Sequence, residues 1–505
     1  MILLDGSHLT LDQLVAIADR HAEVSLAPQA RERVSASRAV VDTMAAGEAA
    51  VYGINTGFGN FAETRVAKAD LARLQVNLLR SHAAGVDAPL EPRTVRAMMA
   101  LRANVLAKGF SGIRVETIEA LLALLNHGIH PRVPSRGSVG ASGDLAPLAH
   151  LALVLIGEGQ TWDGQRTEDG GAALAAAGLT KVDLGPKEGL ALINGTQASA
   201  AVLALALDGA ERLARAADVI AALSIDALLG SRKPFDPRVH APRPFAGQAV
   251  AADNLWRLLD DSPLNASHAN CGRVQDAYSE RCVPQVHGAA REALTWIRHI
   301  VAVEMNAATD NPMVFADEHE IVSGGNFHGA PVAMAADLLA MAVTQLATIS
   351  ERRADRLVNP ALSSGLPAFL TRDGGLQSGL MMAQVTAAAL TSELKGTCHP
   401  ASVDTIPTSA NKEDHVSMSM GAALKAERAL QLARHVLSVE MLCACQAVDL
   451  RTPLVSGRAL MGAHGAVRAV VQTLVDDRPP SSDIEAISQL IASGALEYAT
   501  GMDVN

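Results

Sequence analysis

Four long segments of this chain are rich in alanine and leucine and are apolar on nearly every side. They span residues 197–229, 286–307, 331–352 and 380–395. Alanine and leucine are strong helix formers, and a helix that is apolar all round has to be buried among other helices. Alanine also lets two helix axes approach closely. The segments therefore predict an all-α fold with a long central helical bundle.

Weaker patterns predict further elements. Between residues 421 and 442, apolar residues recur at three- and four-residue steps and charged residues lie mainly on another face, which predicts an amphipathic helix. Thr10 and Gln13 have the spacing of a capping box, which predicts the start of the first helix. Met313–Phe315 and Glu320–Val322 are suited to a short hairpin, so we expect only minor β-hairpin content.

Loops rich in glycine, proline, asparagine and serine separate the helical segments and hold most of the unusual residues. A rigid helical scaffold commonly presents its functional residues on such connections. We expect a loop-rich helical N-terminal part over residues 1–195 and a long-helix bundle over residues 196–505, with a soft boundary that also allows a single domain. The expected loops lie at residues 53–60, 131–143, 230–247, 308–330, 355–380 and 396–415.

Charge and cysteine content narrow the class of protein. The formal net charge is −11 over 505 residues, without basic blocks, which disfavours nucleic acid and anionic membrane surfaces as partners. The five cysteines show neither a CxxC pair nor zinc spacing, which favours free thiols in a reducing compartment. The N-terminus lacks the basic and apolar regions of a secretion signal. We therefore expect a cytoplasmic enzyme that acts on a small molecule.

Residues 136–150, RGSVGASGDLAPLAH, carry the most specific chemistry. The ordinary interpretation is a glycine-rich turn with Asp144 as the N-cap of a helix. Small side chains also let the chain fold back tightly, and glycine supplies an unhindered nitrogen. Attack of the Gly143 nitrogen on the Ala141 carbonyl closes a five-membered ring. Loss of water and then of the Ser142 hydroxyl leaves a methylidene-imidazolone, a strong electrophile that needs no external cofactor.

The segment resembles the signature of the aromatic amino acid lyase family, which contains histidine, phenylalanine and tyrosine ammonia-lyases and related aminomutases. The resemblance covers nearly the whole chain. It implies that Ala141, Ser142 and Gly143 form the electrophile, and that the chain eliminates ammonia from an amino acid. It also implies a homotetramer whose sites combine residues from several chains.

Two further loops match the family in order along the chain. Tyr52 lies in YGINTGFG, whose glycines suit a lid, and the family assigns this tyrosine the removal of the substrate β-proton. An unperturbed tyrosine, with a pKa of about 10, is a poor base at neutral pH unless the site favours its phenolate. Asn194, in LINGTQA, resembles the asparagine that hydrogen-bonds the imidazolone and the substrate.

The segment VQDAYSERC, residues 274–282, resembles the carboxylate clamp of the family. A guanidinium fork suits a carboxylate, so the resemblance assigns Arg281 to the substrate carboxylate. Tyr278 is implied beside the electrophile, and Gln275 as a hydrogen-bonding partner of the substrate or the ring. Phe327, in SGGNFH, resembles an aromatic pocket wall, although an isolated phenylalanine is more often ordinary core.

Two positions favour L-histidine as the substrate, with trans-urocanate as the product. His82 lies where family members distinguish their aromatic substrates, and it is able to hydrogen-bond an imidazole. Glu413, in SANKEDH, resembles the acidic residue that accompanies histidine specificity. Facing a phenyl ring, this carboxylate would be a desolvated charge without a partner, at a cost of roughly a few kcal/mol.

Other features keep alternatives open. Lys412, Gly329, His287 and the stretch 355–369 depart from the usual histidine pattern, and the last looks closer to the phenylalanine and tyrosine branch. The alternatives are therefore a tyrosine or phenylalanine ammonia-lyase or an aminomutase of the same family and, more distantly, a non-catalytic helical assembly protein. The acidic run at residues 317–320 lacks the spacing of a metal site, and we predict no metal.

Overall fold

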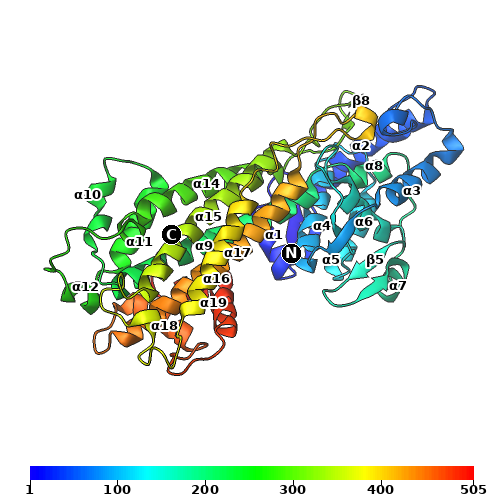
Figure 1. The fold of residues 1–505 in the computed structure, drawn as a ribbon. Helices are drawn as coiled ribbons and strands as arrows, with labels where there is room; N and C mark the ends of the chain where they lie inside the picture. The colour runs from blue at the N-terminus through cyan, green and yellow to red at the C-terminus, as the bar shows by residue number, and fades with distance from the viewer. The chain divides into compact units, whose positions relative to one another are not determined.

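The computed structural model describes residues 1–505, apart from the side chain of Asn60. Helices dominate the chain and the strands are short, which confirms the predicted all-α fold (Figure 1). The chain divides into two compact units. Unit 1 comprises residues 1–205, 298–337 and 400–424, and unit 2 comprises residues 206–297, 338–399 and 425–505.

Unit 1 contains a set of shorter helices and all of the strands among the described residues. Its complete elements are β1 (Ile2–Leu4), α1 (Leu11–Asp19), β2 (Val24–Leu26), α2 (Pro28–Ala46), α3 (Leu71–His82), β3 (Val86–Pro89), α4 (Pro92–Ala107), α5 (Val115–Asn126), β4 (Pro134–Arg136), α6 (Leu145–Leu155), β5 (Gln160–Trp162), β6 (Thr167–Asp169), α7 (Gly170–Ala176), α8 (Glu188–Ile193), β7 (Met313–Phe315) and β8 (Glu320–Val322).

Unit 2 contains the helices α10 (Pro237–His240), α11 (Ala246–Leu258), α12 (Pro263–Ser267), α13 (Tyr278–Arg281), α16 (Met381–Thr397), α18 (Arg458–Arg468), α19 (Ser481–Ser493) and α20 (Ala495–Tyr498). Four longer helices contribute residues to both units: α9 (Gln197–Ala227), α14 (Val283–Glu304), α15 (Ala330–Val358) and α17 (Ser419–Leu450).

The predicted helical segments are confirmed. The four alanine-rich segments form α9, α14, α15 and α16, and the amphipathic segment forms α17. Helix α15 continues to Val358, past its predicted end at residue 352. It is long and apolar enough to cross a membrane, but 72% of its most apolar window is buried inside the protein, as in a core helix. The predicted capping box of Thr10 and Gln13 begins α1.

Within unit 2, the long helices lie side by side and form a bundle (Figure 1). Side-chain hydrogen bonds join pairs of these helices. The bonded pairs are Ser224 with Glu440, Arg353 with Glu440, Gln384 with Glu351, and His287 with Asp218. Alanine, leucine and valine fill the spaces between these pairs. Because most of these side chains are small, the helices pack closely and leave few places for aromatic residues.

The strands form four two-stranded sheets in the described part of the chain. The predicted hairpin is β7–β8, with Met313 opposite Val322. The pairs β3–β4 and β5–β6 are also antiparallel, whereas β1 and β2 run parallel and are connected through α1. A parallel pair needs a crossover connection and therefore leaves no local turn signal in the sequence.

Candidate active site

Two glycines hold the Ala-Ser-Gly loop against the segment that follows α8. Gly143 and Gly195 form a bridge, and Asp144 N donates to Gly195 O at 2.7 Å. Gly143 has φ +73°, and a Cβ there would lie 2.2 Å from Gly195 O. Only glycine allows this approach without a shift of the backbone. The contact therefore holds the Gly143 nitrogen, which would attack the Ala141 carbonyl, next to the Gly195 backbone.

The Asp144 side chain does not cap α6, although the residue occupies the N-cap position. Its carboxylate instead accepts hydrogen bonds from the Ser138 hydroxyl at 2.8 Å and from the Ser199 backbone N–H and hydroxyl at 2.7 and 2.8 Å. Burial raises the pKa of Asp144, and these hydrogen bonds oppose that shift. The side chain therefore ties the loop to the start of α9 rather than to its own helix.

A third contact secures the other end of the loop. The Ser417 hydroxyl donates to Gly140 O at 2.9 Å, and Met418 N donates to Val139 O at 2.8 Å. A Cβ at Gly329 would lie 2.4 Å from the Ser419 hydroxyl, so the glycine that departs from the family pattern fits this close approach. The start of α17 thus packs directly on the loop that precedes Ala141.

Ser142 receives hydrogen-bonding partners at both its carbonyl and its hydroxyl. Asn194 Nδ2 donates to Ser142 O at 2.9 Å, and the Ser142 hydroxyl donates to Glu413 Oε1 at 2.7 Å. Asn194 is 3% exposed, and its Oδ1 is buried without a protein partner. Buried polar atoms without partners are uncommon and often await a ligand or water. Asn194 therefore contacts the loop with its amide nitrogen and leaves an acceptor free beside it.

His82 ends α3 and lines the same cavity as Ser142. Its Nδ1 lies 2.9 Å from Leu78 O, which is only an acceptor, so Nδ1 carries the proton in the neutral ring. Burial lowers the pKa of His82, while the Leu78 carbonyl and Glu413 raise it less strongly. A neutral His82 with a protonated Nδ1 has its Nε2 free to accept a hydrogen bond.

Tyr52 lies in a turn after α2 and packs edge-on against Phe58, with ring centroids 6.5 Å apart. Burial raises the pKa of Tyr52, the Gly59 backbone lowers it, and the negative charge of Glu413 raises it further. The surroundings that this chain provides therefore favour the neutral phenol. A base role for Tyr52 requires either alkaline pH or a positive charge that approaches it.

Seven predicted residues border two cavities of unit 1. A cavity of about 610 Å³ is lined by Tyr52, His82, Ser142, Asn194 and Glu413 together with leucines, isoleucine and phenylalanines. A more polar cavity of about 650 Å³ shares four of these residues and adds Ala141 and Phe327. Ser142 therefore faces an apolar space that suits a ring and a polar space that suits an amino acid head group.

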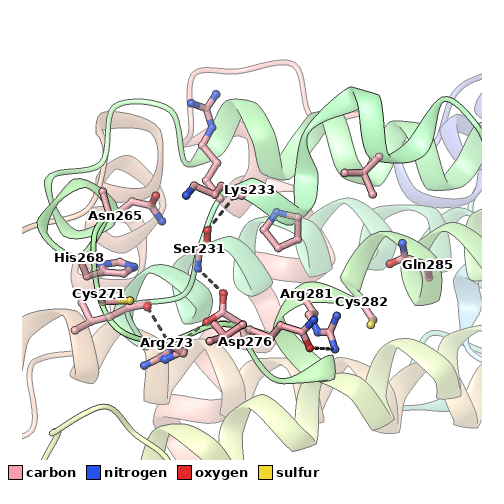
Figure 2. Close-up of a pocket in the computed structure, with 17 residues that line it drawn as sticks. Ser231, Lys233, Asn265, His268, Cys271, Arg273, Asp276, Arg281, Cys282 and Gln285 are labelled. Carbon is pink, nitrogen blue, oxygen red and sulfur yellow. Dashed lines mark hydrogen bonds and ion pairs between the residues drawn. The ribbon is translucent and has the colours of Figure 1, made fainter.

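The remaining predicted residues form a separate group in unit 2, which consists of Gln275, Tyr278 and Arg281. Arg281 Nη2 donates to Gln275 Oε1 at 2.9 Å, and the Arg281 guanidinium stacks 4.7 Å from the Tyr278 ring centre. Figure 2 shows the cavity of about 520 Å³ beside them, with Arg281 and Cys282 on one side and His268 on the other. Tyr278 is 71% exposed, so its ring is available to another surface.

Buried ion pairs anchor the short helix α13, which carries Tyr278 and Arg281. Arg353 donates to Ser279 O at 3.2 Å and forms two hydrogen bonds with Glu440, at 2.5 and 2.8 Å. Arg353 and Glu440 are fully buried. The backbone of α13 is therefore held by charges that the bundle encloses, while the ring of Tyr278 is largely exposed.

The sequence did not indicate several of these supporting residues. Thr408 holds Glu413 through a hydrogen bond of 2.5 Å to Oε2, and Arg102 donates to Asn194 O at 2.7 Å. Neither residue belongs to one of the predicted motifs. Ser199 is equally unremarkable in the sequence, and only its contact with Asp144 marks it. Among the described residues, no group of three or more His, Cys, Asp or Glu side chains is suited to a metal ion.

The chain matches known proteins over nearly its whole length. Residues 9–469 match the family model described as aromatic amino acid lyase. A histidine ammonia-lyase from Anaeromyxobacter dehalogenans is 58% identical over 98% of this chain and 99% of its own length.

Solved structures also match. A histidine ammonia-lyase from Trypanosoma cruzi has a TM-score of 0.92 and 44% identity, covering 99% of this chain and 95% of its own. A tyrosine aminomutase from Streptomyces globisporus has a TM-score of 0.94 and 37% identity, covering 99% and 98%.

Proposed function

We propose that this chain removes ammonia from L-histidine and releases trans-urocanate. The chain belongs to the aromatic amino acid lyase family. The chain is a carbon–nitrogen lyase, and curated histidine ammonia-lyases are 53–58% identical to it over 98–99% of its length. The observation that carries the substrate assignment is the presence of His82 and Glu413 in one cavity with Ser142.

The reaction requires an electrophile, and we assign it to the methylidene-imidazolone formed from Ala141, Ser142 and Gly143. The loop fits this group because Gly143 is pressed against Gly195 and Asn194 already donates to the carbonyl that the ring would contain. The group supplies an electrophilic carbon that activates the amine as a leaving group, without an external cofactor. The first turn of α6 follows the loop, and its partial positive charge favours electron density drawn into the ring.

The remaining residues bind the substrate and move its proton. Arg281 holds the α-carboxylate through its guanidinium fork, with Gln275 and Tyr278 beside it. Tyr52 removes the β-proton, and Phe327 forms part of the wall of the polar cavity. Because elimination needs only a base, a carboxylate clamp and an activated amine, these side chains suffice for the chemistry.

Histidine is favoured over phenylalanine and tyrosine because the cavity offers hydrogen-bond acceptors at the ring end. The single N–H of a neutral imidazole donates either to the Nε2 of neutral His82 or to the Glu413 carboxylate, and an imidazolium donates to both. A phenyl ring offers no donor to His82 Nε2 or to Glu413 Oε1, so both acceptors lose water without gaining a partner, which disfavours it.

We also propose a homotetramer in which each site combines residues from several chains. Tyr278 is 71% exposed, and large apolar residues such as Met334 and Met382 are about 60% exposed on the long helices. Large apolar side chains that are left exposed in this way are often covered by a partner chain. A cytoplasmic location is consistent with the acidic charge and with the five cysteines, all of which are free thiols.

The test is an ultraviolet assay of the purified protein with L-histidine, L-tyrosine and L-phenylalanine in separate reactions. Urocanate from histidine alone is the expected result. Coumarate or cinnamate would keep the elimination chemistry and overturn the substrate. Formation of a β-amino acid from tyrosine would point to an aminomutase, the activity of the solved relative from Streptomyces globisporus.

A further inference from the structure

We propose that Glu413 acts earlier as well, as the acid that releases the Ser142 hydroxyl while the electrophile forms. The inference rests on the proposed function, because it assumes that Ala141, Ser142 and Gly143 mature into the methylidene-imidazolone. It adds to Glu413 a chemical role in maturation that is separate from its contact with the histidine ring.

The contact between Ser142 and Glu413 belongs to the immature chain. The Ser142 hydroxyl oxygen lies 2.7 Å from Glu413 Oε1, across a sequence separation of 271 residues. Maturation removes this hydroxyl, so the hydrogen bond cannot exist in the finished enzyme. The hydroxyl is also a poor leaving group unless it is protonated as the carbon–oxygen bond breaks. In the resting contact the Glu413 carboxylate accepts a hydrogen bond from this hydroxyl. After the carboxylate takes up a proton from solvent, the same oxygen is placed to give that proton to Oγ.

The surrounding loop holds the Glu413 carboxyl in this position. The Thr408 hydroxyl donates to Glu413 Oε2 at 2.5 Å, and Thr408 N donates to Glu413 O at 3.0 Å. Three consecutive residues between them, Ser409, Ala410 and Asn411, have φ between +50° and +65°. Non-glycine residues adopt this conformation at a cost, so a run of three indicates a loop that tertiary contacts impose. The oxygen that Thr408 does not occupy faces Ser142.

Asn194 supports the same step at the opposite end of Ser142. Its Nδ2 donates to Ser142 O at 2.9 Å from a side chain that is 3% exposed. Loss of the Ser142 Cα proton places negative charge on this carbonyl oxygen. A fixed donor at that oxygen stabilises the charge, as in an oxyanion hole. Donor and acid thus contact the two atoms of Ser142 at which charge develops.

The step balances without an additional reactant. The Cα proton of Ser142 passes to water in the cavity, and its electron pair forms the Cα–Cβ double bond. The Cβ–Oγ bond breaks, and Oγ takes a proton from the Glu413 carboxyl and leaves as water. Glu413 thereby returns to its starting carboxylate form, and the proton that it first took from solvent balances the Cα proton released to water. One water is lost in this step, and the other is lost when the Gly143 nitrogen and the Ala141 carbonyl close the ring.

The experiment follows maturation directly rather than enzyme activity. Full-length wild-type chain and variants are made by cell-free synthesis, and the mass of the peptide that contains Ser142 is measured at intervals. Wild type should lose the mass of two waters. Glu413→Gln retains a hydrogen-bonding side chain but cannot act as an acid. General acid catalysis commonly contributes about 10²- to 10⁴-fold, so the variant should lose the second water at least about 100-fold more slowly.

Two further variants separate acidity from simple structural support. Glu413→Asp retains a carboxyl with a shorter reach, so it should mature faster than Glu413→Gln. Glu63→Gln removes a carboxylate that lines the same polar cavity, and it should mature at the wild-type rate. Circular dichroism and thermal melting identify any variant that fails to fold, and only folded variants are compared.

The outcomes distinguish this inference from the proposed function. Failure of wild type to lose two waters would overturn the electrophile itself. Normal loss in wild type with equally fast loss in Glu413→Gln would overturn the role of Glu413 in maturation and leave the lyase assignment intact. Slower maturation in Glu413→Asp than in Glu413→Gln would also contradict an acid role, because it would indicate that reach matters and acidity does not.

Discussion

At the scale of single residues, the proposed base role of Tyr52 predicts how activity responds to pH. Burial and the negative charge of Glu413 both raise that pKa, so the phenolate form is scarce at neutral pH. A base acts only in its deprotonated form. We therefore expect kcat/KM for histidine to rise as the pH increases. The midpoint of that rise should be the pKa of Tyr52.

Two substitutions test this assignment. Tyr52→Phe should lower kcat by about 10²- to 10⁴-fold and remove the rise. Glu413→Gln removes the negative charge beside Tyr52 and should move the rise to lower pH. Rates are normalised to the fraction of chains whose Ser142 peptide has lost two waters. A rise that stays at the same pH in Glu413→Gln would show that this carboxylate does not act on Tyr52.

A second prediction at this scale concerns Gly195, which the chemistry does not use directly. A Cβ at this position would lie 2.6 Å or less from Arg102 Nη1 and Gln197 Oε1, and the backbone has φ +149°. Gly195→Ala should therefore move the segment that follows α8 away from Gly143. The displaced loop should then fail to lose the two waters. The mass of the Ser142 peptide measures this. Gly465→Ala, at a position in α18 with open space around it and without a positive φ, is the control for a general effect of replacing glycine.

At the scale of elements, buried charges hold α13 and with it Arg281. Removing one partner of a buried ion pair leaves an uncompensated charge, which commonly costs about 3–5 kcal/mol. Glu440→Gln should therefore lower the free energy of unfolding by that amount and raise KM for histidine, because Arg353 loses the partner that holds it under Ser279. Denaturant unfolding and steady-state kinetics measure the two effects.

The exposed pair of Arg428 and Glu393 provides the matched control for this substitution. Both side chains are about half exposed, and surface pairs contribute about 0–1 kcal/mol. Glu393→Gln should therefore change stability and KM little. Similar losses in Glu393→Gln and Glu440→Gln would contradict the anchoring role of the buried pair.

Another buried pair explains one departure from the family pattern. His287, which departs from the family pattern expected from the sequence, is fully buried in α14, and its Nδ1 lies 2.7 Å from Asp218 Oδ1. Arg291 donates to the other oxygen of Asp218 at 2.6 Å. Burial lowers the pKa of His287, and the Asp218 hydrogen bond opposes that shift. The polar residue is therefore tolerated in the bundle because α9 supplies its partner.

At the scale of the whole molecule, the proposed tetramer predicts complementation between inactive chains. Ser142→Ala and Arg281→Ile should each be nearly inactive alone. If a site takes Ser142 from one chain and Arg281 from another, co-expressed chains form some sites in which both residues are intact, and part of the activity returns. Native mass spectrometry verifies that mixed assemblies form. Mixed tetramers without activity would place both residues of a site on the same chain.

The sequence by itself determined the helical fold, and it also carries the proposal of which loop is reactive. The helices of the bundle follow from the apolar, alanine-rich composition of single segments, which acts over a few turns and needs no distant partner. The reactive loop is equally local, since Ala141, Ser142 and Gly143 are consecutive. The β7–β8 hairpin was predictable for the same reason, because its two strands are close in sequence.

Only the tertiary structure decided which side chains support these local features. Glu413 contacts Ser142 across 271 residues, and the Asp144 carboxylate binds Ser199 instead of capping the helix that it begins. Such contacts depend on the path of the whole chain, and many sequences with the same local patterns would lack them. A short-range pattern fixes what a segment forms, whereas buried polar groups take whichever partner packing brings within hydrogen-bond distance.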